Sequence, residues 1–218
     1  RDAGITARTD QVTGHVSGGH GWTKPGRVFR NAGLQGGAFR TNDFGGNKTA
    51  MGLFAFYWGT FKNYWGFEGS AFVNPESIST TQTRGGVAML RPHGWSWDFG
   101  VNSDDRKSLT VNFGTRGGHG DMGSNYSRGG WVSINWKPAP KIAVSLNPDY
   151  QYFKNGAQWV ANIADPEAKA TYGTRNVFAR LKQETFSAGV RVNWTFTPTL
   201  SLQTYFQPLI ASGKYTDY

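Results

Sequence analysis

The sequence contains no cysteine, few charges and no long apolar run, and each of these absences excludes a class of protein. Without cysteine, the chain has no disulfide framework, no cysteine-based zinc site and no thiol nucleophile. No run of about 18 apolar residues occurs, which excludes a transmembrane helix. Charged residues make up 17% of the chain and aromatic residues 15%, the opposite of a disordered composition. Helical periodicity is also nearly absent, so we expect an all-β protein.

Alternation of apolar and polar residues is the dominant pattern after about residue 90. In one segment Phe186, Val190 and Trp194 alternate with Ser187 and Arg191. Because side chains alternate across a strand, each such segment has one apolar and one polar face. Strands with this pattern are predicted at 94–102, 108–114, 131–137, 141–153, 185–197 and 199–210, and strands with mixed faces at 27–40, 48–60 and 62–73.

Strand length and connection length favour a membrane barrel. The longest predicted strands have 12 to 13 residues, whereas soluble strands typically have about 5–6 and about 9–11 tilted residues cross the hydrocarbon. Short connections at 137–140 and 197–199 contrast with long ones at 74–92, 115–129 and 154–174, as in transmembrane barrels. We therefore predict an antiparallel transmembrane β-barrel, with roughly ten strands in this chain, as part of a larger barrel.

The domain organisation is expected to be simple. Residues 1–26 are rich in glycine and are predicted to be irregular, and residues 27–218 are predicted to form the barrel strands and loops. No charged segment followed by an apolar stretch opens the chain, which leads us to expect a mature or truncated chain.

The formal net charge is +9, which raises the question of a nucleic-acid partner. The lysines and arginines are scattered, and the densest group is Arg106-Lys107. This distribution argues against nucleic acid and favours contact with an anionic phospholipid or lipopolysaccharide surface.

No motif predicts a catalytic, metal or cofactor site. Residues 118–123 match GxGxxG, but no helical pattern follows, so we expect a flexible loop. His15, His20, His93 and His119 have no metal-ligand spacing. Residues 103–105 lack the spacing of a calcium loop, and we expect a polar turn at 104–107. No GxSxG motif is present, so we expect a non-enzymatic protein without cofactor.

Seven charged residues fall on predicted polar faces and are candidates to face a barrel lumen, where they would pair or set solute selectivity. They are Glu68, Asp98, Lys137, Asp149, Arg180, Lys182 and Arg191. The alternative architecture is a soluble β-sandwich that binds carbohydrate, with Trp95, Trp97 or Trp131 as stacking platforms.

Several segments resemble the DUF5916 family. They are residues 84–89, 101–107, 157–160, 164–168, 172–179 and 186–215, and the most specific part is 196–215, with the sequence FTPTLSLQTYFQPLIASGKY. The resemblance covers about residues 60–218. The C-terminal region of this family resembles an outer-membrane β-barrel, which implies a location in the outer membrane of a Gram-negative bacterium.

The resemblance also implies what to expect around and beyond the chain. Similar proteins often begin with a carbohydrate-binding-module-like domain and continue with further strands, so we expect the chain to be incomplete at both ends. The family supplies no established catalytic residues. We expect a pore, a binding platform or a subunit of an envelope complex, whose partners are membrane lipid, lipopolysaccharide, other envelope proteins, and a glycan or small solute.

Overall fold

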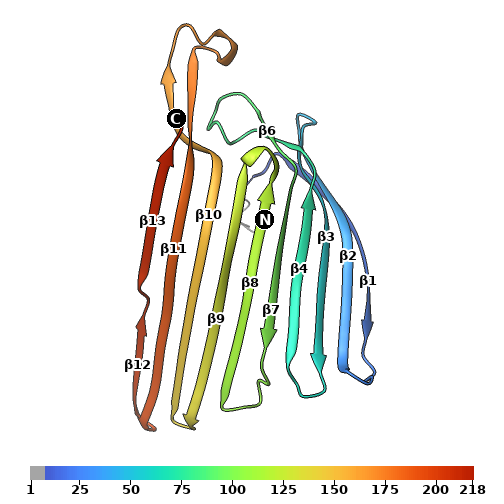
Figure 1. The fold of residues 1–218 in the computed structure, drawn as a ribbon, viewed down its shortest axis with the longest axis vertical. Helices are drawn as coiled ribbons and strands as arrows, with labels where there is room; N and C mark the ends of the chain where they lie inside the picture. The colour runs from blue at the N-terminus through green and yellow to red at the C-terminus, as the bar shows by residue number, and fades with distance from the viewer. Residues whose placement is uncertain (1–7) are drawn as a thin grey trace.

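The computed structural model describes residues 8–218 and shows one large antiparallel sheet (Figure 1). Its strands are β1 (Gln11–Trp22), β2 (Phe29–Asp43), β3 (Lys48–Phe61), β4 (Gly66–Asn74), β7 (Gly94–Asn102), β8 (Leu109–Gly120), β9 (Asn125–Ala139), β10 (Ile142–Ala164), β11 (Thr174–Thr197), β12 (Leu200–Phe206) and β13 (Leu209–Thr216). From β1 to β12, each of these strands pairs with the next one along the chain. Because β12 and β13 both pair with β11, end to end, the eleven strands occupy ten positions.

The prediction of an all-β antiparallel fold is confirmed, but the sheet is not closed. Within residues 8–218, β1 pairs with β2 alone, and β12 and β13 pair with β11 alone. The structure therefore has two open edges. No helix in the described residues is long and apolar enough to cross a membrane.

The strand register divides the sheet into two chemically different faces. On one face, called here the apolar face, Leu146 lies opposite both Val190 and Ile134. On the other, called the polar face, Asn147 lies opposite Gly189. Further residues of the apolar face are Val16, Leu34, Leu53, Val73, Trp95, Phe99, Phe113, Val144, Phe186, Trp194, Leu202 and Ile210.

Within residues 8–218, no other layer packs on the apolar face, and these residues form no conventional hydrophobic core. Ala179 and Leu181 are the only hydrophobic residues counted as buried in the described chain. By contrast, Leu53 is 58% exposed and Ile210 68% exposed. An apolar surface of this size is unfavourable in water, because burial of apolar groups is the main driving force of folding. The face therefore requires apolar surroundings.

Glycine and aromatic residues are paired directly across neighbouring strands. A Cβ atom on Gly33 would lie 2.1 Å from the indole of Trp58, and one on Gly69 would lie 2.3 Å from the Tyr57 hydroxyl. The same close packing joins further cross-strand partners, Gly37 with Phe54, Gly52 with Phe39, Gly59 with Phe67, Gly117 with Trp97 and Gly114 with Trp131. The missing side chain leaves room for the ring to lie flat on the neighbouring strand.

The connections differ between the two ends of the sheet. At the lower end in Figure 1, residues 23–28, 62–65, 103–108, 140–141 and 198–199 form short turns. At the upper end, residues 44–47 and 121–124 are short, but 165–173 and 75–93 are longer. The 75–93 connection contains a small hairpin of β5 (Ser77–Ser79) and β6 (Met89–Arg91). Both longer connections therefore lie at the same end.

Three sequence predictions are corrected by the structure. Residues 1–7 lie outside the described chain, but the irregular segment predicted up to residue 26 contains β1, which pairs with β2 along its whole length. The loop predicted at 115–129 is instead the end of β8, a turn with one 3-10 helix (η1, Asp121–Gly123) and the start of β9. The loop predicted at 154–174 begins after residue 164. The first two segments are rich in glycine, which weakens the alternation of apolar and polar residues. The side chains that pack on these glycines belong to strands elsewhere in the sequence, so no local pattern reveals these strands.

The hairpin of β10 and β11 extends beyond the rest of the sheet. Register shifts occur between Asn155 and Gln158 and between Trp159 and Ala161. Such bulges increase the local twist of a hairpin. The two strands have 23 and 24 residues, more than the 12 to 13 expected from the sequence, and their upper part stands above the neighbouring strands (Figure 1).

The close packing of Trp131 on Gly114 gives a direct test of the glycine–aromatic pairing. A Cβ atom on Gly114 would lie 2.8 Å from the indole and 2.7 Å from the Phe99 carbonyl oxygen, so Gly114→Ala is expected to lower the free energy of unfolding by about 1–3 kcal/mol. Circular dichroism during thermal unfolding, together with tryptophan fluorescence, measures the effect. Gly189→Ala is the matched control, because nothing lies closer than 3.9 Å to its added Cβ. Equal melting temperatures for the two variants would contradict the steric role of Gly114.

Candidate functional site

A charged cluster occupies the centre of the polar face. Arg116 on β8 donates from Nη2 to both carboxylate oxygens of Asp149 on β10, at 2.7 and 2.8 Å. Asp98 on β7, the cross-strand partner of Arg116, accepts a hydrogen bond from Ser70 on β4. Both Arg116 and Asp149 remain about one third exposed. The cluster therefore presents charges of both signs to the space over this face.

A glycine determines the reach of Arg116. The residue opposite Arg116 on β9 is Gly129, and a Cβ atom there would lie 3.4 Å from Arg116 Nε and 2.6 Å from the carbonyl oxygen of Tyr150. Because Gly129 has no side chain, the guanidinium passes over β9 and reaches Asp149 two strands away. An exposed ion pair of this kind contributes little to stability.

Trp131 lies beside this cluster as a flat aromatic surface. Its indole rests on Gly114, and its Cζ2 atom would lie 3.4 Å from a Cβ on Gly100 of the next strand. Glu68 is opposite Gly100 and lies 3.5 Å from the Asn102 side-chain amide. A ring flanked by carboxylates and a guanidinium suits a polar solute with an apolar side, such as a sugar.

Amide and hydroxyl side chains cover the polar face towards the short turns. Ser133 donates to Asn147 Oδ1 at 2.7 Å, and Asn135 donates to Ser133 at 3.3 Å. The side chain of Thr115 lies on the apolar face by register, and its hydroxyl donates to the Gly129 carbonyl oxygen at 3.0 Å. This part of the polar face is therefore rich in hydrogen-bonding groups, and Arg191, opposite Ser145 on β10, adds a positive charge to it.

An aromatic patch lies on the polar face over the strands near the N-terminus. Phe54 and Phe56 are 5.4 Å apart between ring centroids, and Phe56 packs edge-on against Phe72 at 5.7 Å. Phe39 and Trp58 share this face. The sequence indicated mixed faces here, and the structure shows the reason: aromatic rings on both faces fill the space above glycines.

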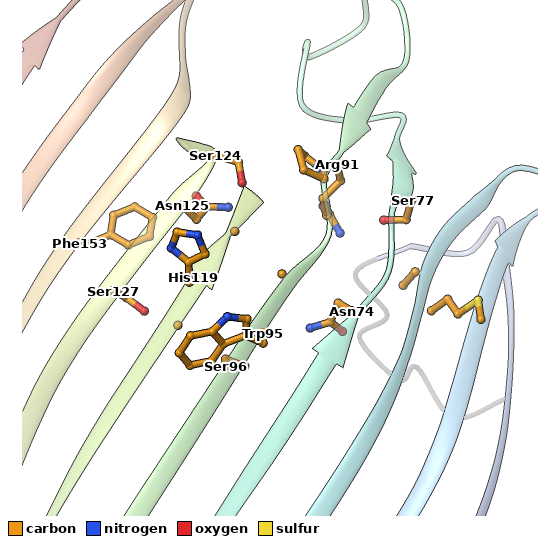
Figure 2. Close-up of a pocket in the computed structure, with 16 residues that line it drawn as sticks. Asn74, Ser77, Arg91, Trp95, Ser96, His119, Ser124, Asn125, Ser127 and Phe153 are labelled. Atoms are coloured by element: carbon orange, nitrogen blue, oxygen red, sulfur yellow. The ribbon is translucent and has the colours of Figure 1, made fainter. Parts of the chain in front are cut away.

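The β5–β6 hairpin covers a hollow at the upper end of the polar face. The cavity has a volume of about 490 Å³. Figure 2 shows Ser77 and Arg91 of the hairpin on one side, and Ser96, Asn125 and Ser127 of the sheet on the other. Its lining mixes serine and asparagine side chains with apolar and aromatic ones, among them Trp95 and Phe153. Ser77 and Ser79 are themselves buried, so this connection is packed against the sheet.

The 75–93 connection continues across to the β10–β11 hairpin. Gln82 donates to the Ala157 carbonyl oxygen at 3.2 Å, and Asn162 donates to the Thr83 carbonyl oxygen at 3.0 Å. The guanidinium carbon of Arg84 lies 4.0 Å from the ring centroid of Trp159, within the range of a cation–π interaction. Thr83 is 1% exposed. We call residues 75–93 the crossing loop, because it connects the neighbouring strands β4 and β7 but also contacts the distant β10–β11 hairpin.

The seven charged candidates do not share one surface. Register and alternation place Glu68, Asp98, Lys137, Asp149 and Arg191 on the polar face. Arg180 and Lys182 lie on the opposite face, in line with Phe186 and Trp194. The expectation of a common face is therefore wrong for these two residues, because β11 continues its alternation without interruption from 174 to 197. Arg116 was missed, although the alternation of 108–114, continued by two residues, would have included it.

The remaining sequence motifs lie in strands of the sheet and in the turns between them. Residues 118–120 end β8 and no α-helix follows the GxGxxG match. His93 contacts Asp121 at 3.2 Å, His119 packs against Trp95, and His15 and His20 lie on opposite faces of β1. Within residues 8–218, no group of three or more His, Cys, Asp or Glu side chains is placed to hold a metal ion.

The polar turn predicted at 104–107 is present and joins β7 to β8. Arg106 donates from Nε and Nη2 to the two carboxylate oxygens of Asp104 at 2.8 and 2.7 Å, and its backbone N–H donates to Oδ1 at 3.1 Å. The guanidinium also lies 3.1 Å from the ring centroid of Tyr64 in the neighbouring turn. These side-chain and backbone hydrogen bonds from Arg106 lower the pKa of the Asp104 carboxyl to about 2.

The family described as a domain of unknown function (DUF5916) matches residues 1–218. The chain belongs to the DUF5916 family. The match includes the glycine-rich strands β1 and β2, which the motif resemblance over about residues 60–218 did not reach. No curated protein and no solved structure matches this DUF5916 chain.

Asp104 gives this DUF5916 chain a predictable response to acid. Because the folded-state pKa is depressed, the carboxylate stabilises the fold above its unfolded pKa of about 4, and this contribution is lost as the pH falls through about 2. Asp104→Asn is therefore expected to melt at a lower temperature than the parent at pH 6. The difference should shrink between about pH 4 and pH 2.

Thermal unfolding at several pH values measures this difference. Asp105→Asn in the same turn is the control, since Asp105 forms no ion pair in the described residues. A difference for Asp104→Asn that did not change with pH would contradict the assignment to its charge.

Proposed function

We propose that the sheet is part of the wall of a transmembrane β-barrel in the outer membrane of a Gram-negative bacterium. The observation that carries this proposal is the exposed apolar face without a packed core. Lipid hydrocarbon would supply the apolar surroundings that this face requires, and water would hydrate the polar face. Closing the barrel requires both open edges to be hydrogen-bonded, because unpaired strand edges are not tolerated in hydrocarbon.

The length of the apolar runs supports this proposal. On β10 the apolar face runs from Ile142 to Tyr152, and on β11 from Phe186 to Phe196. Each run contains eleven residues and therefore ten steps of about 3.3 Å, or about 33 Å along the strand. At a tilt of about 45° this length crosses about 23 Å, close to the apolar band of about 25 Å in outer-membrane barrels.

Aromatic residues at both ends of these runs also support the proposal. At the end with the short turns, Trp194 packs against Phe196 at 4.7 Å, and Phe29 packs against Phe61 at 5.1 Å. At the other end, Tyr126 packs against Tyr152 at 6.0 Å. Aromatic side chains prefer the headgroup region, where one end of the ring is apolar and the other is hydrated.

The polar face would line the interior, and the protein would act there as a pore or solute-binding surface rather than as an enzyme. Arg116, Asp149 and Trp131 present two charges and a flat ring to passing solutes. Small sugars and other polar solutes match this chemistry, since they combine hydroxyl groups with a partly apolar face.

The β-sandwich alternative predicts a second layer over the apolar face. The eleven strands form one sheet, and the two-stranded β5–β6 hairpin is the other sheet in the described chain. The three tryptophans suggested as carbohydrate platforms are also divided, with Trp95 and Trp97 on the apolar face and Trp131 on the polar face. The two architectures differ in what contacts the apolar face, which can be tested.

The absence of cysteine makes the two faces accessible to single-site labelling. Leu146→Cys and Asn147→Cys are adjacent on β10 and point to opposite faces. With an environment-sensitive fluorophore in lipid vesicles, position 146 is expected to be quenched by a lipid-borne quencher and position 147 by aqueous iodide. Failure of the lipid-borne quencher to reach position 146, or a chain that stays folded and monomeric without detergent, would overturn the barrel.

Conductance through planar bilayers tests the role of the charged cluster. Arg116→Gln removes the cation between Asp98 and Asp149, so the permeability ratio of K⁺ to Cl⁻ is expected to rise. Lys141→Gln is the control, because it removes the same charge from a turn at the end of the sheet. Equal reversal potentials for Arg116→Gln and the parent would show that this cluster does not line the conducting path.

A further inference from the structure

A row of three lysines crosses adjacent strands on the apolar face. Lys154 on β10 lies directly opposite Lys182 on β11, and Lys182 lies directly opposite Lys214 on β13. Directly opposed residues have Cβ atoms about 4.5–5.5 Å apart. The three ammonium groups therefore emerge on the same side of the sheet as near neighbours, with Lys182 and Lys214 exposed and Lys154 half-buried.

In the described part of the chain, no acidic residue is directly opposite any of the three lysines. None of the three lysines forms an ion pair within residues 8–218. Glu184 shares the face but is opposite Tyr152 and Ser212, and Asp217 is occupied by Arg180 at 3.3 Å. Like charges directly opposite one another destabilise a sheet. The row is therefore an arrangement that an external anion would stabilise.

The position of the row relative to the apolar runs indicates where that anion would be. Lys154 is the next residue on the apolar face beyond Tyr152, at the end of the run that begins with Ile142. On β11, one residue of that face, Glu184, separates Lys182 from Phe186. In a membrane, these ammonium groups would lie just outside the hydrocarbon, at the depth of the lipid phosphates.

Two arginines flank the row. Arg128 on β9 lies opposite Tyr152, with its guanidinium carbon 5.2 Å from the ring centroid. Arg180 is the next residue to Lys182 on the same face of β11. Together with the three lysines they outnumber the two acids of this region, Glu184 and Asp217. Arginine and lysine both form charge-assisted hydrogen bonds to phosphate oxygens.

We propose that Lys154, Lys182 and Lys214 form a binding site for the phosphate group of an anionic membrane lipid. A phosphate monoester fits best, because its charge of nearly −2 matches several ammonium groups better than the single charge of a diester. The inference depends on the proposed function in one respect, that the apolar face contacts lipid. A simpler role for Lys214 alone would be to keep an edge strand from pairing with other chains, but that role needs no row across three strands.

The test uses the full chain in neutral detergent micelles, titrated with short-chain phosphatidic acid, phosphatidylglycerol, phosphatidylcholine or inorganic phosphate. We expect binding in the order phosphatidic acid, phosphatidylglycerol, phosphatidylcholine, and weaker binding of inorganic phosphate, which lacks acyl chains. Replacing all three lysines by glutamine is expected to weaken phosphatidic acid binding by about tenfold or more, since each basic residue near an anionic surface contributes about 1 kcal/mol. Replacing all three by arginine should preserve binding.

A matched control removes the same charge at the other end of the sheet. Lys107, Lys137 and Lys141 lie in or beside the short turns, and replacing all three by glutamine should leave the affinity within about twofold of the parent. Equal losses in both triple variants would overturn the site in favour of diffuse electrostatic attraction. Inorganic phosphate binding as tight as phosphatidic acid binding would overturn the lipid assignment.

The labelling experiment at positions 146 and 147 separates this inference from the proposed function. If position 146 is quenched from lipid but the lysine-to-glutamine variant binds phosphatidic acid like the parent, the lysine site is wrong and the barrel stands. If position 146 is not quenched from lipid, the barrel fails, whatever the lysine variants show. Circular dichroism of each variant verifies that the strands are retained, so that a loss of binding is not a loss of fold.

Discussion

Cross-strand contact is the interaction on which this structure depends. Most globular proteins bury side chains between layers, whereas this chain forms one layer and has almost no buried hydrophobic residue. Its strands are held by backbone hydrogen bonds and by side chains that pack on the neighbouring strand. The pairing of Gly33 with Trp58 and of Gly114 with Trp131 is the clearest form of this packing. It explains why a chain with 30 glycines, a residue that weakens isolated strands, is nevertheless built of long strands.

The extent to which the sequence predicts this fold follows from the same pairing. Segments such as 185–197 carry their own alternation, so the strand and its faces could be predicted locally. Strand β1 and the end of β8 could not, because glycine has no side chain to place on either face. Their strand character depends on partners such as Phe39 and Trp97, which lie elsewhere in the sequence. Family membership was predictable from the motif at 196–215, and the wider match is confirmed.

The candidate site was predicted less well than the fold. Asp98 and Asp149 were found from alternation, but their link through Arg116 depends on the space above Gly129, which no local pattern reveals. Arg180 and Lys182 were assigned to the polar face from their chemistry alone. The register shows that charged residues also follow the apolar face once its apolar run has ended. For a sheet of this kind, the position of a residue within its alternation is a better guide to its face than its polarity.

The crossing loop has a mechanical consequence for the sheet. It leaves β4, passes through the β5–β6 hairpin and reaches the far hairpin, where Gln82 and Asn162 form hydrogen bonds between the two. A curved sheet without a core has little else to fix its radius, since neighbouring strands can change their twist at small cost. A connection of set length, fastened at both ends, limits how far the strands between β4 and β10 can spread. The crossing loop therefore limits the separation of these strands, and its length limits the width of the hollow beneath it.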